Sequence, residues 1–339
     1  MNTAAPSRIS AVHPLRAVEG GRVTISGYGF LDEAGLPDIR FGTVQATIAC
    51  ASPHAVTAIV PGGLDGARTP IRIESAPGET AYVEVGAPIA TGLHQVDNPV
   101  FDPDGNLYVT FSGTRGQQSP VAIYVVRPDG TRAPFVTDLP NPTSMAFGPD
   151  GHLYVSSRFE GSVHRVLRDG TVTTYATDLG VACGIAFGPD GKLYIGDRSG
   201  SILALHDTRV TQFAEIPPSV AAFHLAFGPD GGLYVSAPTL SSRDVVYRVS
   251  PSGEVGVFAD GFGRPQGLAF DAAGSLYVVD AIAGDSALFR IRLDHPSEKE
   301  RVLAGGALIG VAFDAAGALV VASSDTVYRF AAPGALPAD

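Results

Sequence analysis

Tryptophan is missing from this chain of 339 residues, and cysteine occurs only twice, at Cys50 and Cys183. The two cysteines lie in segments with different sequence patterns and in no metal-binding spacing, so the sequence predicts neither a disulfide framework nor a zinc site. No apolar run approaches the roughly 20 residues that a membrane-spanning helix needs. The N-terminus also lacks a basic stretch followed by an apolar run. We therefore expect a soluble, cytoplasmic protein, or a secreted or periplasmic one if a leader has been removed.

Basic residues are scarce: 23 Lys and Arg stand against 34 Asp and Glu, which gives a net charge of −11. Nucleic acid is bound by concentrated basic surfaces, so this balance argues against a nucleic-acid partner. The G-x-S-x-G elbow, the H-E-x-x-H zinc motif and the phosphate-binding P-loop are absent as well. These absences remove the commonest hydrolase, zinc-protease and nucleotidase signatures.

The 41 glycines and 26 prolines, by contrast, are abundant and recur at regular positions. The segment AFGPDGHLYV at residues 146–155 returns at 186–195 and 226–235, and looser copies begin at residues 100, 269 and 312. The turn glycines stand 40 to 46 residues apart: Gly105, Gly151, Gly191, Gly231, Gly274 and Gly317. A strand-turn-strand repeat of this period is typical of propeller blades. The Asp-Gly pairs are interpreted as tight turns, because they lack the further oxygen ligands of a calcium loop.

Each repeat is predicted to contain four strands, which the third repeat places at residues 184–187, 193–196, 201–205 and 210–214. Only five outer strands follow the six repeats. The sixth is predicted upstream, because residues 87–93 resemble residues 174–179, and it would pair with residues 326–330. This arrangement of three strands from one end and one from the other closes the ring and removes exposed sheet edges. The sequence therefore predicts an all-β protein with a six-bladed propeller.

The first 86 residues do not carry the repeat. Apolar and polar residues alternate in short segments separated by Gly and Pro, at residues 23–26, 39–41, 46–48, 55–60 and 71–74. Such alternation is typical of half-buried strands, and about seven of them suggest an immunoglobulin-like β-sandwich. We expect this sandwich over residues 1–86, the propeller over 87–333 and a tail over 334–339.

The same N-terminal segment resembles the IPT/TIG domain. The resemblance rests on Ile9–Pro14, on the run GGRVTISGYGF from Gly20 to Phe30, and on the pairs Phe41-Gly42 and Val60-Pro61. It implies an Ig-like fold that serves as a spacer, an interface or a carbohydrate-associated module, without catalysis. The repeat region resembles NHL-type propellers and, more loosely, the gluconolactonase and streptogramin-lyase propellers, over about 245 residues. That resemblance implies the fold far more than an activity.

Propellers bind ligands where loops enter the innermost strands, so two positions before each inner Phe are of interest. These pairs are Asp97-Asn98, Thr143-Ser144, Cys183-Gly184, Phe223-His224, Gln266-Gly267 and Ile309-Gly310. The second residue is small in four blades, but it is Asn98 in the first and His224 in the fourth, which face each other across a six-fold ring. These two side chains either hydrogen-bond neighbouring strands or line a shared pocket.

The gluconolactonase resemblance implies a divalent metal held by one Glu, two Asn and one Asp. Asp97 stands in place of the Glu, Cys183 in place of one Asn, and Gln266 in place of the Asp. The other Asn falls at Thr143 or Phe223, depending on the blade register.

This resemblance makes Asp97, Asn98 and Gln266 the candidate ligands of Ca²⁺ or another divalent metal, with three oxygens at most. Asp97 and His224 are then the candidate catalytic residues of a metal-dependent lactone hydrolase or lyase. The leading prediction is instead a binding protein, with a small molecule, a glycan or a protein at the mouth of the propeller.

A second group of polar residues follows the second strand of the blades. Asp197 and Asp280 are interpreted either as caps of the next turn or as ligand contacts. Arg158, Arg198 and Arg264 lie near one rim and suit a carboxylate-bearing ligand, because a guanidinium binds a carboxylate with two parallel hydrogen bonds. The predicted ligand-binding residues are Asn98, Thr143, Arg158, Cys183, Asp197, Arg198, Gln266 and Asp280.

Overall fold

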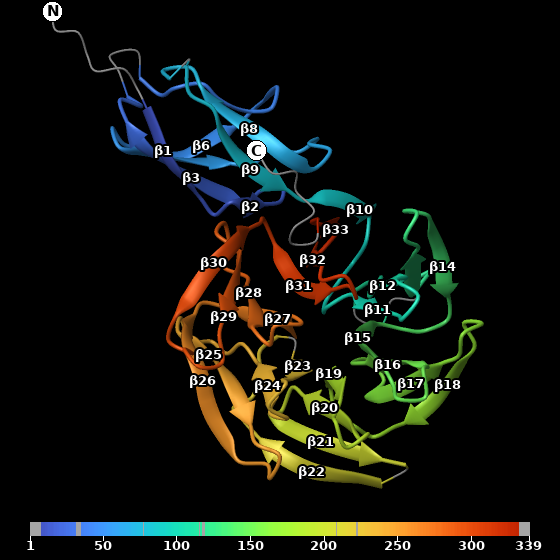
Figure 1. Ribbon diagram of the computed structural model, residues 1–339. Helices are drawn as coiled ribbons and strands as arrows, with labels where there is room; N and C mark the ends of the chain where they lie inside the picture. Colours follow the sequence, from blue (N-terminus) through green and yellow to red (C-terminus); the bar gives the residue numbers. More distant parts are fainter. Residues whose placement is uncertain are drawn as a thin grey trace, which may run out of the picture.

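The protein is described from a computed structural model that covers residues 8–31, 35–76, 78–114, 116, 119–207, 209–221 and 223–331. The predicted tail, residues 334–339, lies outside this range. Every regular element in the described ranges is a β-strand, which confirms the predicted all-β class. Those ranges contain no helix long and apolar enough to cross a membrane. Figure 1 shows a ring of sheets with a smaller sandwich on its rim.

The sandwich consists of two sheets. One has the order β1-β3-β7-β6, with strands Arg8–His13, Arg22–Tyr28, Ala55–Ile59 and Thr47–Ala51. The other has the order β2-β9-β8-β4-β5, with strands Arg16–Ala17, Ala81–Val85, Ala67–Ile73, Ile39–Phe41 and Val44–Gln45. Because side chains alternate along a strand, Val23 and Ile25 of β3 point inward and share one core with Ile71 and Ile73 of β8. The alternation predicted from the sequence is thus the alternation that builds this core.

The repeat region forms six four-stranded units around a central axis, called blades 1 to 6 in chain order. Blade 1 contains β11 to β14, which are Val100–Phe101, Leu107–Thr110, Ile123–Val126 and Arg132–Val136. Blade 2 contains β15 to β18, which are Pro142–Phe147, Leu153–Ser157, Ser162–Val166 and Val172–Ala176. Blade 3 contains β19 to β22, which are Ala182–Phe187, Leu193–Asp197, Ser201–His206 and Arg209–Glu215.

Blade 4 contains β23 to β26, which are His224–Phe227, Leu233–Ser236, Asp244–Val249 and Val255–Phe262. Blade 5 contains β27 to β30, which are Pro265–Phe270, Leu276–Asp280, Ala287–Ile291 and Lys299–Ala304. Blade 6 has the order β31-β32-β33-β10, with strands Leu308–Phe313, Leu319–Ser323, Thr326–Arg329 and Ala87–Thr91.

The repeated residues explain how neighbouring blades pack. The second-strand tyrosine of one blade meets the inner phenylalanine of the next: the ring centroids of Tyr194 and Phe227 are 5.0 Å apart and steeply inclined. This edge-to-face geometry is favourable for aromatic pairs. The turn between the first two strands needs glycine, because Gly191 has φ of 77°.

The predicted closure of the ring is confirmed. Strand β10 pairs antiparallel with β33, from Ala87 opposite Arg329 to Thr91 opposite Thr326. The chain therefore enters the propeller as the outer strand of its last blade, and that blade has four strands like the other five.

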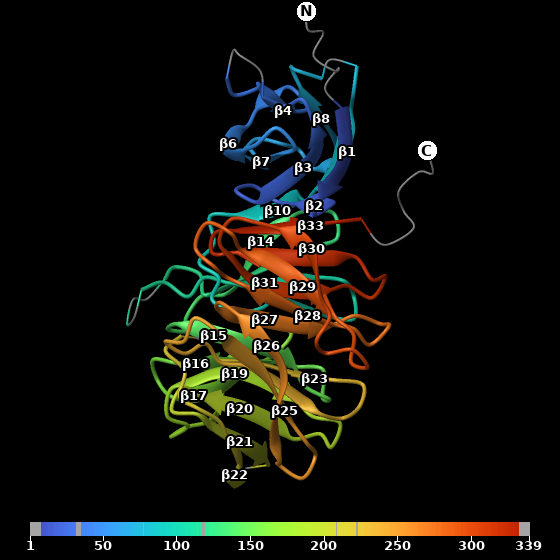
Figure 2. The same ribbon diagram turned by 90° about the vertical axis from the view of Figure 1, so that its left-hand side faces the viewer.

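The sandwich is attached more firmly than a closing strand alone would require. Strand β2 runs parallel to β9 of the sandwich and to β30 of blade 5, so both domains share a nine-stranded sheet (Figure 2). Val18, which follows β2, packs with the apolar residues of blades 5 and 6. Only Gly86 separates β9 from β10, and a Cβ atom there would lie 2.8 Å from the Phe330 ring. The junction is therefore short and densely packed.

Candidate functional site

The two ends of the propeller differ in what they present. At one end, which we call the mouth face, the loops that enter the inner strands meet the loops between the second and third strands. Two examples are the hydrogen bonds from Val220 N to Pro238 O, 2.9 Å, and from Ala281 N to Arg264 O, 2.9 Å. The Asp-Gly turns lie at the other end, the turn face. All the site residues predicted from the sequence belong to the mouth end.

A buried histidine joins three blades at the axis. His224 begins β23 and is fully buried. Its Nδ1 lies 2.5 Å from Oδ1 of Asp97, just before blade 1, and its Nε2 lies 3.2 Å from Oε1 of Gln266 in blade 5. Asp97 and Gln266 are themselves buried, with 4% and 6% of their surface exposed. We call these three residues and Asn98 the axial cluster.

The charge of His224 follows from its partners. Burial lowers the pKa of His224, but the Asp97 charge and the hydrogen bonds with Asp97 and Gln266 together outweigh it, so the pKa is raised above its ordinary value. Both ring nitrogens face acceptor oxygens, which an imidazolium with two N–H donors satisfies and a neutral ring does not. His224 and Asp97 therefore form a buried ion pair.

The sequence had suggested that Asn98 and His224 face each other across the ring. In the structure, Asn98 instead bridges two other blades. Its Nδ2 donates to Leu268 O in blade 5, at 2.9 Å, and its Oδ1 accepts from Val311 N in blade 6, at 2.9 Å. The small residues at the other channel positions allow this closure. A Cβ atom on Gly267 would collide with the Asn98 side chain, and one on Gly310 would lie 2.8 Å from Asp97 O.

The expected Ca²⁺ ligands do not fit a divalent cation. Oδ1 of Asp97 also accepts from Asn98 N, at 2.6 Å, while the side-chain oxygens of Asn98 and Gln266 hold Val311 N and His224. A metal at this place would displace these bonds and lie beside a positively charged imidazolium. The described residues contain no group of three or more His, Cys, Asp or Glu that could hold a metal ion. The axial cluster thus places an organic cation where the gluconolactonase resemblance implied a metal.

Thr143 and Cys183 lie close to the axis and are both 1% exposed. Oγ1 of Thr143 donates to Asn141 O, at 3.1 Å, and accepts from Arg158 N, at 3.4 Å. Burial raises the pKa of the Cys183 thiol to about 12. A thiol with such a pKa stays protonated at neutral pH and is a poor nucleophile.

Asp197 and Asp280 cap the loops that enter their own blades. Oδ1 of Asp197 accepts from Val181 N, at 2.8 Å, and Oδ1 of Asp280 accepts from Arg264 N, at 2.6 Å. Ser157 has the same place in blade 2 and donates to Pro140 O, at 2.8 Å. The sequence left open whether these aspartates cap turns or contact a ligand. These hydrogen bonds are those of the capping role.

Arg158 and Arg198 are half-buried at the mouth face. Nη2 of Arg198 donates to Val220 O, at 2.7 Å, while its Nε is buried without a partner among the described residues. Both arginines directly follow the second strand of their blades, β16 and β20, so they belong to neighbouring mouth loops, and their positive charges act to lower the pKa of the buried Cys183 thiol. Arg264 is exposed on the same face.

The sequence interpretation missed a group of exposed apolar side chains that we call the apolar rim. It consists of Phe159, Val181, Val220, Leu240 and Ile282, with 49%, 36%, 42%, 92% and 43% of their surfaces exposed. All five lie on mouth loops of blades 2 to 5, among twelve exposed large apolar residues in the described chain. Such residues are unusual in polar loops, and a search for apolar residues in the predicted loops would have found them.

Two family models match the chain. The SMP-30/Gluconolactonase/LRE-like region matches residues 151–337, and the IPT/TIG domain matches residues 6–82. No curated protein sequence matches the chain.

Solved structures resemble the fold. A putative gluconolactonase has 19% sequence identity and a TM-score of 0.59, over 72% of this chain and 90% of that one. An auxiliary nutrient binding protein from Bacteroides thetaiotaomicron has 12% identity and a TM-score of 0.56, over 96% and 98% of the two chains. A catalytically inactive histidine-to-alanine variant of virginiamycin B lyase from Staphylococcus aureus, with quinupristin, has 15% identity and a TM-score of 0.54, over 96% of each chain.

At these identities the likeness to solved structures concerns the fold. The matched family model, however, spans more than half of the chain, from the second blade to beyond the last strand. The chain carries an IPT/TIG domain before its propeller, and it belongs to the SMP-30/gluconolactonase/LRE-like family.

Proposed function

We propose that this protein is a binding protein whose mouth face takes a small molecule with an apolar body and a carboxylate. The observation that carries the proposal is the apolar rim, with Arg158 and Arg198 in the same face of a chain whose net charge is −11. Exposed apolar side chains that gather on one face of a monomer are typical of a binding surface. A guanidinium supplies two parallel donors to a carboxylate, and the side chains of Arg158 and Arg198 are both partly exposed on this face.

The axial cluster lies beneath this site, and its contacts favour a structural role over a catalytic one. His224 has no exposed surface, and both its nitrogens already have partners. A general base must reach the proton that it removes, directly or through one water, and His224 reaches neither. The description of one structural neighbour as an auxiliary nutrient binding protein agrees with a role in binding a metabolite.

The proposal is tested by calorimetric titration with a panel of carboxylates of increasing apolar size, from sugar acids to fatty and aromatic acids. We expect binding that strengthens with apolar area and weakens about tenfold or more in Arg158→Gln and Arg198→Gln, since a hydrogen bond to a charged group contributes about 1.5–3 kcal/mol. Arg209→Gln, on exposed strand β22, is the matched control and should bind as the wild type does. Equal binding by all variants, or preference for neutral sugars, would contradict the proposal.

A metal-dependent lactone hydrolase or lyase is the second candidate. Family membership favours it, whereas the bonds of Asp97 and Gln266 with His224 oppose it. This candidate requires that a divalent metal support activity and that Asp97→Asn abolish both metal binding and activity. Lactone hydrolysis that is lost in EDTA and restored by Ca²⁺ would favour it over the binding protein.

A further inference from the structure

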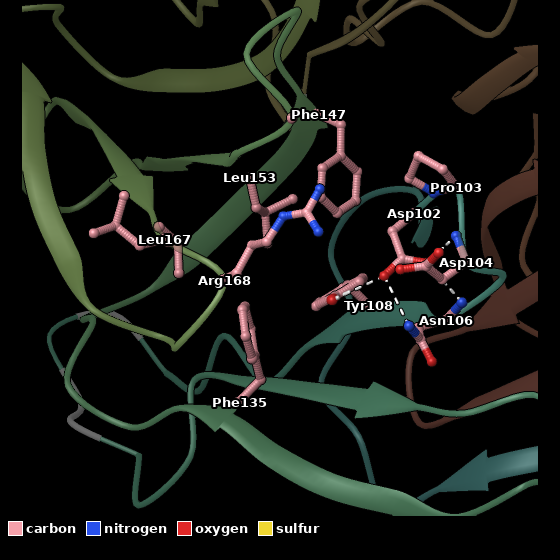
Figure 3. Close-up of a pocket in the computed structure, with 12 residues that line it drawn as sticks. Asp102, Pro103, Asp104, Asn106, Tyr108, Phe135, Phe147, Leu153, Leu167 and Arg168 are labelled. Carbon is pink, nitrogen blue, oxygen red and sulfur yellow. Dashed lines mark hydrogen bonds between the residues drawn. The ribbon is translucent and has the colours of Figure 1, made fainter.

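The turn face contains a cavity between blades 1 and 2, at the opposite end of the propeller from the mouth. Figure 3 shows the residues that line it. Its volume is about 220 Å³. Three aromatic rings, Tyr108, Phe135 and Phe147, form part of its wall, and Tyr108 packs edge-to-face on both phenylalanines, with centroids 5.0 and 5.4 Å apart. Asp102 and Asp104 border the cavity from blade 1, and Arg168 borders it from blade 2.

In blades 2, 3, 4 and 6, a cation of the same blade pairs with the carboxylate of the equivalent turn, while in blade 5 Arg290 stands opposite Tyr277 and pairs with Glu300 instead. In blades 2 and 4 the cation is an arginine on the third strand, directly opposite the second-strand tyrosine. The pairs are Arg165–Asp150 at 2.7 Å in blade 2, Lys192–Asp190 at 2.8 Å in blade 3, Arg248–Asp230 at 2.7 Å in blade 4, and Arg329–Asp314 in blade 6. The repeat thus provides a place for a cation beside each of these turns.

Blade 1 leaves this place without a cation. Tyr108 stands opposite Val125 rather than an arginine, and Asn106 occupies the sequence position of Lys192. Within the described ranges, the Asp102 carboxylate accepts from neutral groups only, such as the Tyr108 hydroxyl at 3.1 Å and Asn106 Nδ2 at 2.8 Å. Among the described residues, neither Asp102 nor Asp104 has an ion-pair partner.

The cation that does approach the cavity is also unpaired. Arg168 lies on the turn between β17 and β18, and its side chain extends toward Phe147 and the two carboxylates in Figure 3. The described part of the chain offers its guanidinium no hydrogen bond or ion pair within bonding distance. One cavity therefore presents an unpaired guanidinium and two carboxylates without a cation, separated by aromatic surface.

We propose that this cavity binds a small zwitterion that has a guanidinium or ammonium group at one end and a carboxylate at the other. The cationic end takes the place that Arg165 and Arg248 fill in their own blades, beside Asp102 and Asp104 and near the Tyr108 ring. The carboxylate end pairs with Arg168, and the aliphatic part packs on Phe135 and Phe147. Free arginine has this chemistry. The site is separate from the mouth face and does not depend on the function proposed for it.

Calorimetric titration with three probes tests both ends of the ligand. L-arginine carries both groups, agmatine lacks the carboxylate, and citrulline replaces the guanidinium with a neutral urea of similar shape. We expect agmatine and citrulline to bind at least about tenfold more weakly than arginine, because each loses one charged pair. In Arg168→Gln, arginine should bind no better than agmatine, and in Asp104→Asn it should lose affinity. Absence of arginine binding to the wild type, or equal binding of citrulline, would overturn the proposal.

A substitution that fills the cavity from within the chain provides a sharper test. Val125→Arg gives blade 1 the arginine that blades 2 and 4 carry at the same register position, so this variant should fold. Its guanidinium should occupy the place of the ligand and reduce arginine affinity at least about tenfold. Ala204→Arg makes the same change in blade 3, opposite Tyr194, and should leave the affinity unchanged. Arginine binding that is unaltered in Val125→Arg would place the ligand elsewhere and refute the site.

Discussion

At the scale of single residues, His224 links the inner strands of the propeller at its axis. This side chain is fully buried, and its partners Asp97 and Gln266 come from two other blades. The sequence identified all three positions, because they occupy two adjacent places before the inner strands of the repeat: Asp97 and Gln266 the first place, and His224 the second. It could not show that His224 pairs with Asp97 rather than facing Asn98, because a difference of one residue in an irregular loop decides which side chain reaches the axis.

His224→Gln is expected to lower the free energy of unfolding by about 3–5 kcal/mol at neutral pH, because it leaves Asp97 buried without a cation. Denaturant unfolding measures this change. The double variant His224→Gln, Asp97→Asn removes both charges and should be more stable than the single variant. If the double variant is as unstable as the sum of the two single variants, the two residues are not coupled.

The pH dependence of stability has a definite sign. The pKa of His224 is raised in the folded state, so its contribution to stability is complete below the unfolded value of about 6.5 and is lost as the pH rises through the folded value. We therefore expect the wild type to lose stability relative to His224→Gln above neutral pH, in unfolding curves measured from pH 6 to 9. A difference between the two proteins that stays constant over this range would contradict the account.

At the scale of elements, glycine allows the inner strands to close on the axis. Gly267→Ala should destabilise the protein by about 1–3 kcal/mol, because its Cβ atom would meet Asn98 and lie 2.6 Å from Ile309 O. Gly256→Ala, in strand β26, is the control, since its Cβ atom would have no heavy atom within 4 Å. Thermal unfolding of the two variants compares them directly, and equal melting temperatures would show that the axis is less tightly packed than described.

The strands were the most predictable part of the molecule. The repeat predicted β17, and its outer neighbour β18, at the residues where the structure has them, and the count of outer strands predicted the closure by β10. Turn glycines and alternating apolar residues are local signals, so they can be recognised in the sequence without the structure. The pairing of β2 with β30 has no such signal, because it joins a two-residue strand to a partner nearly 290 positions away.

At the scale of the whole molecule, the sandwich and the propeller are expected to unfold together. They share a continuous sheet through β2, and the ring of Phe330 packs under the single residue that separates the domains. Phe330 is 2% exposed, so Phe330→Ala should lower the free energy of unfolding by about 3–5 kcal/mol. Calorimetry should show one transition for the wild type. Phe159→Ala, with the same side chain 49% exposed, is the control and should melt near the wild type. Two separate transitions in the wild type would show that the domains are independent.

The central claim is that a protonated histidine, not a metal, completes the axis of this propeller. Nitrogen NMR of labelled protein, with the His224 signals assigned by their loss in His224→Gln, tests this claim most directly. The account predicts that both ring nitrogens of His224 are protonated at pH 7 and that their shifts do not change when Ca²⁺ or Zn²⁺ replaces EDTA. A neutral ring, or ring nitrogens that shift on addition of metal, would contradict the account and favour the metal-dependent hydrolase.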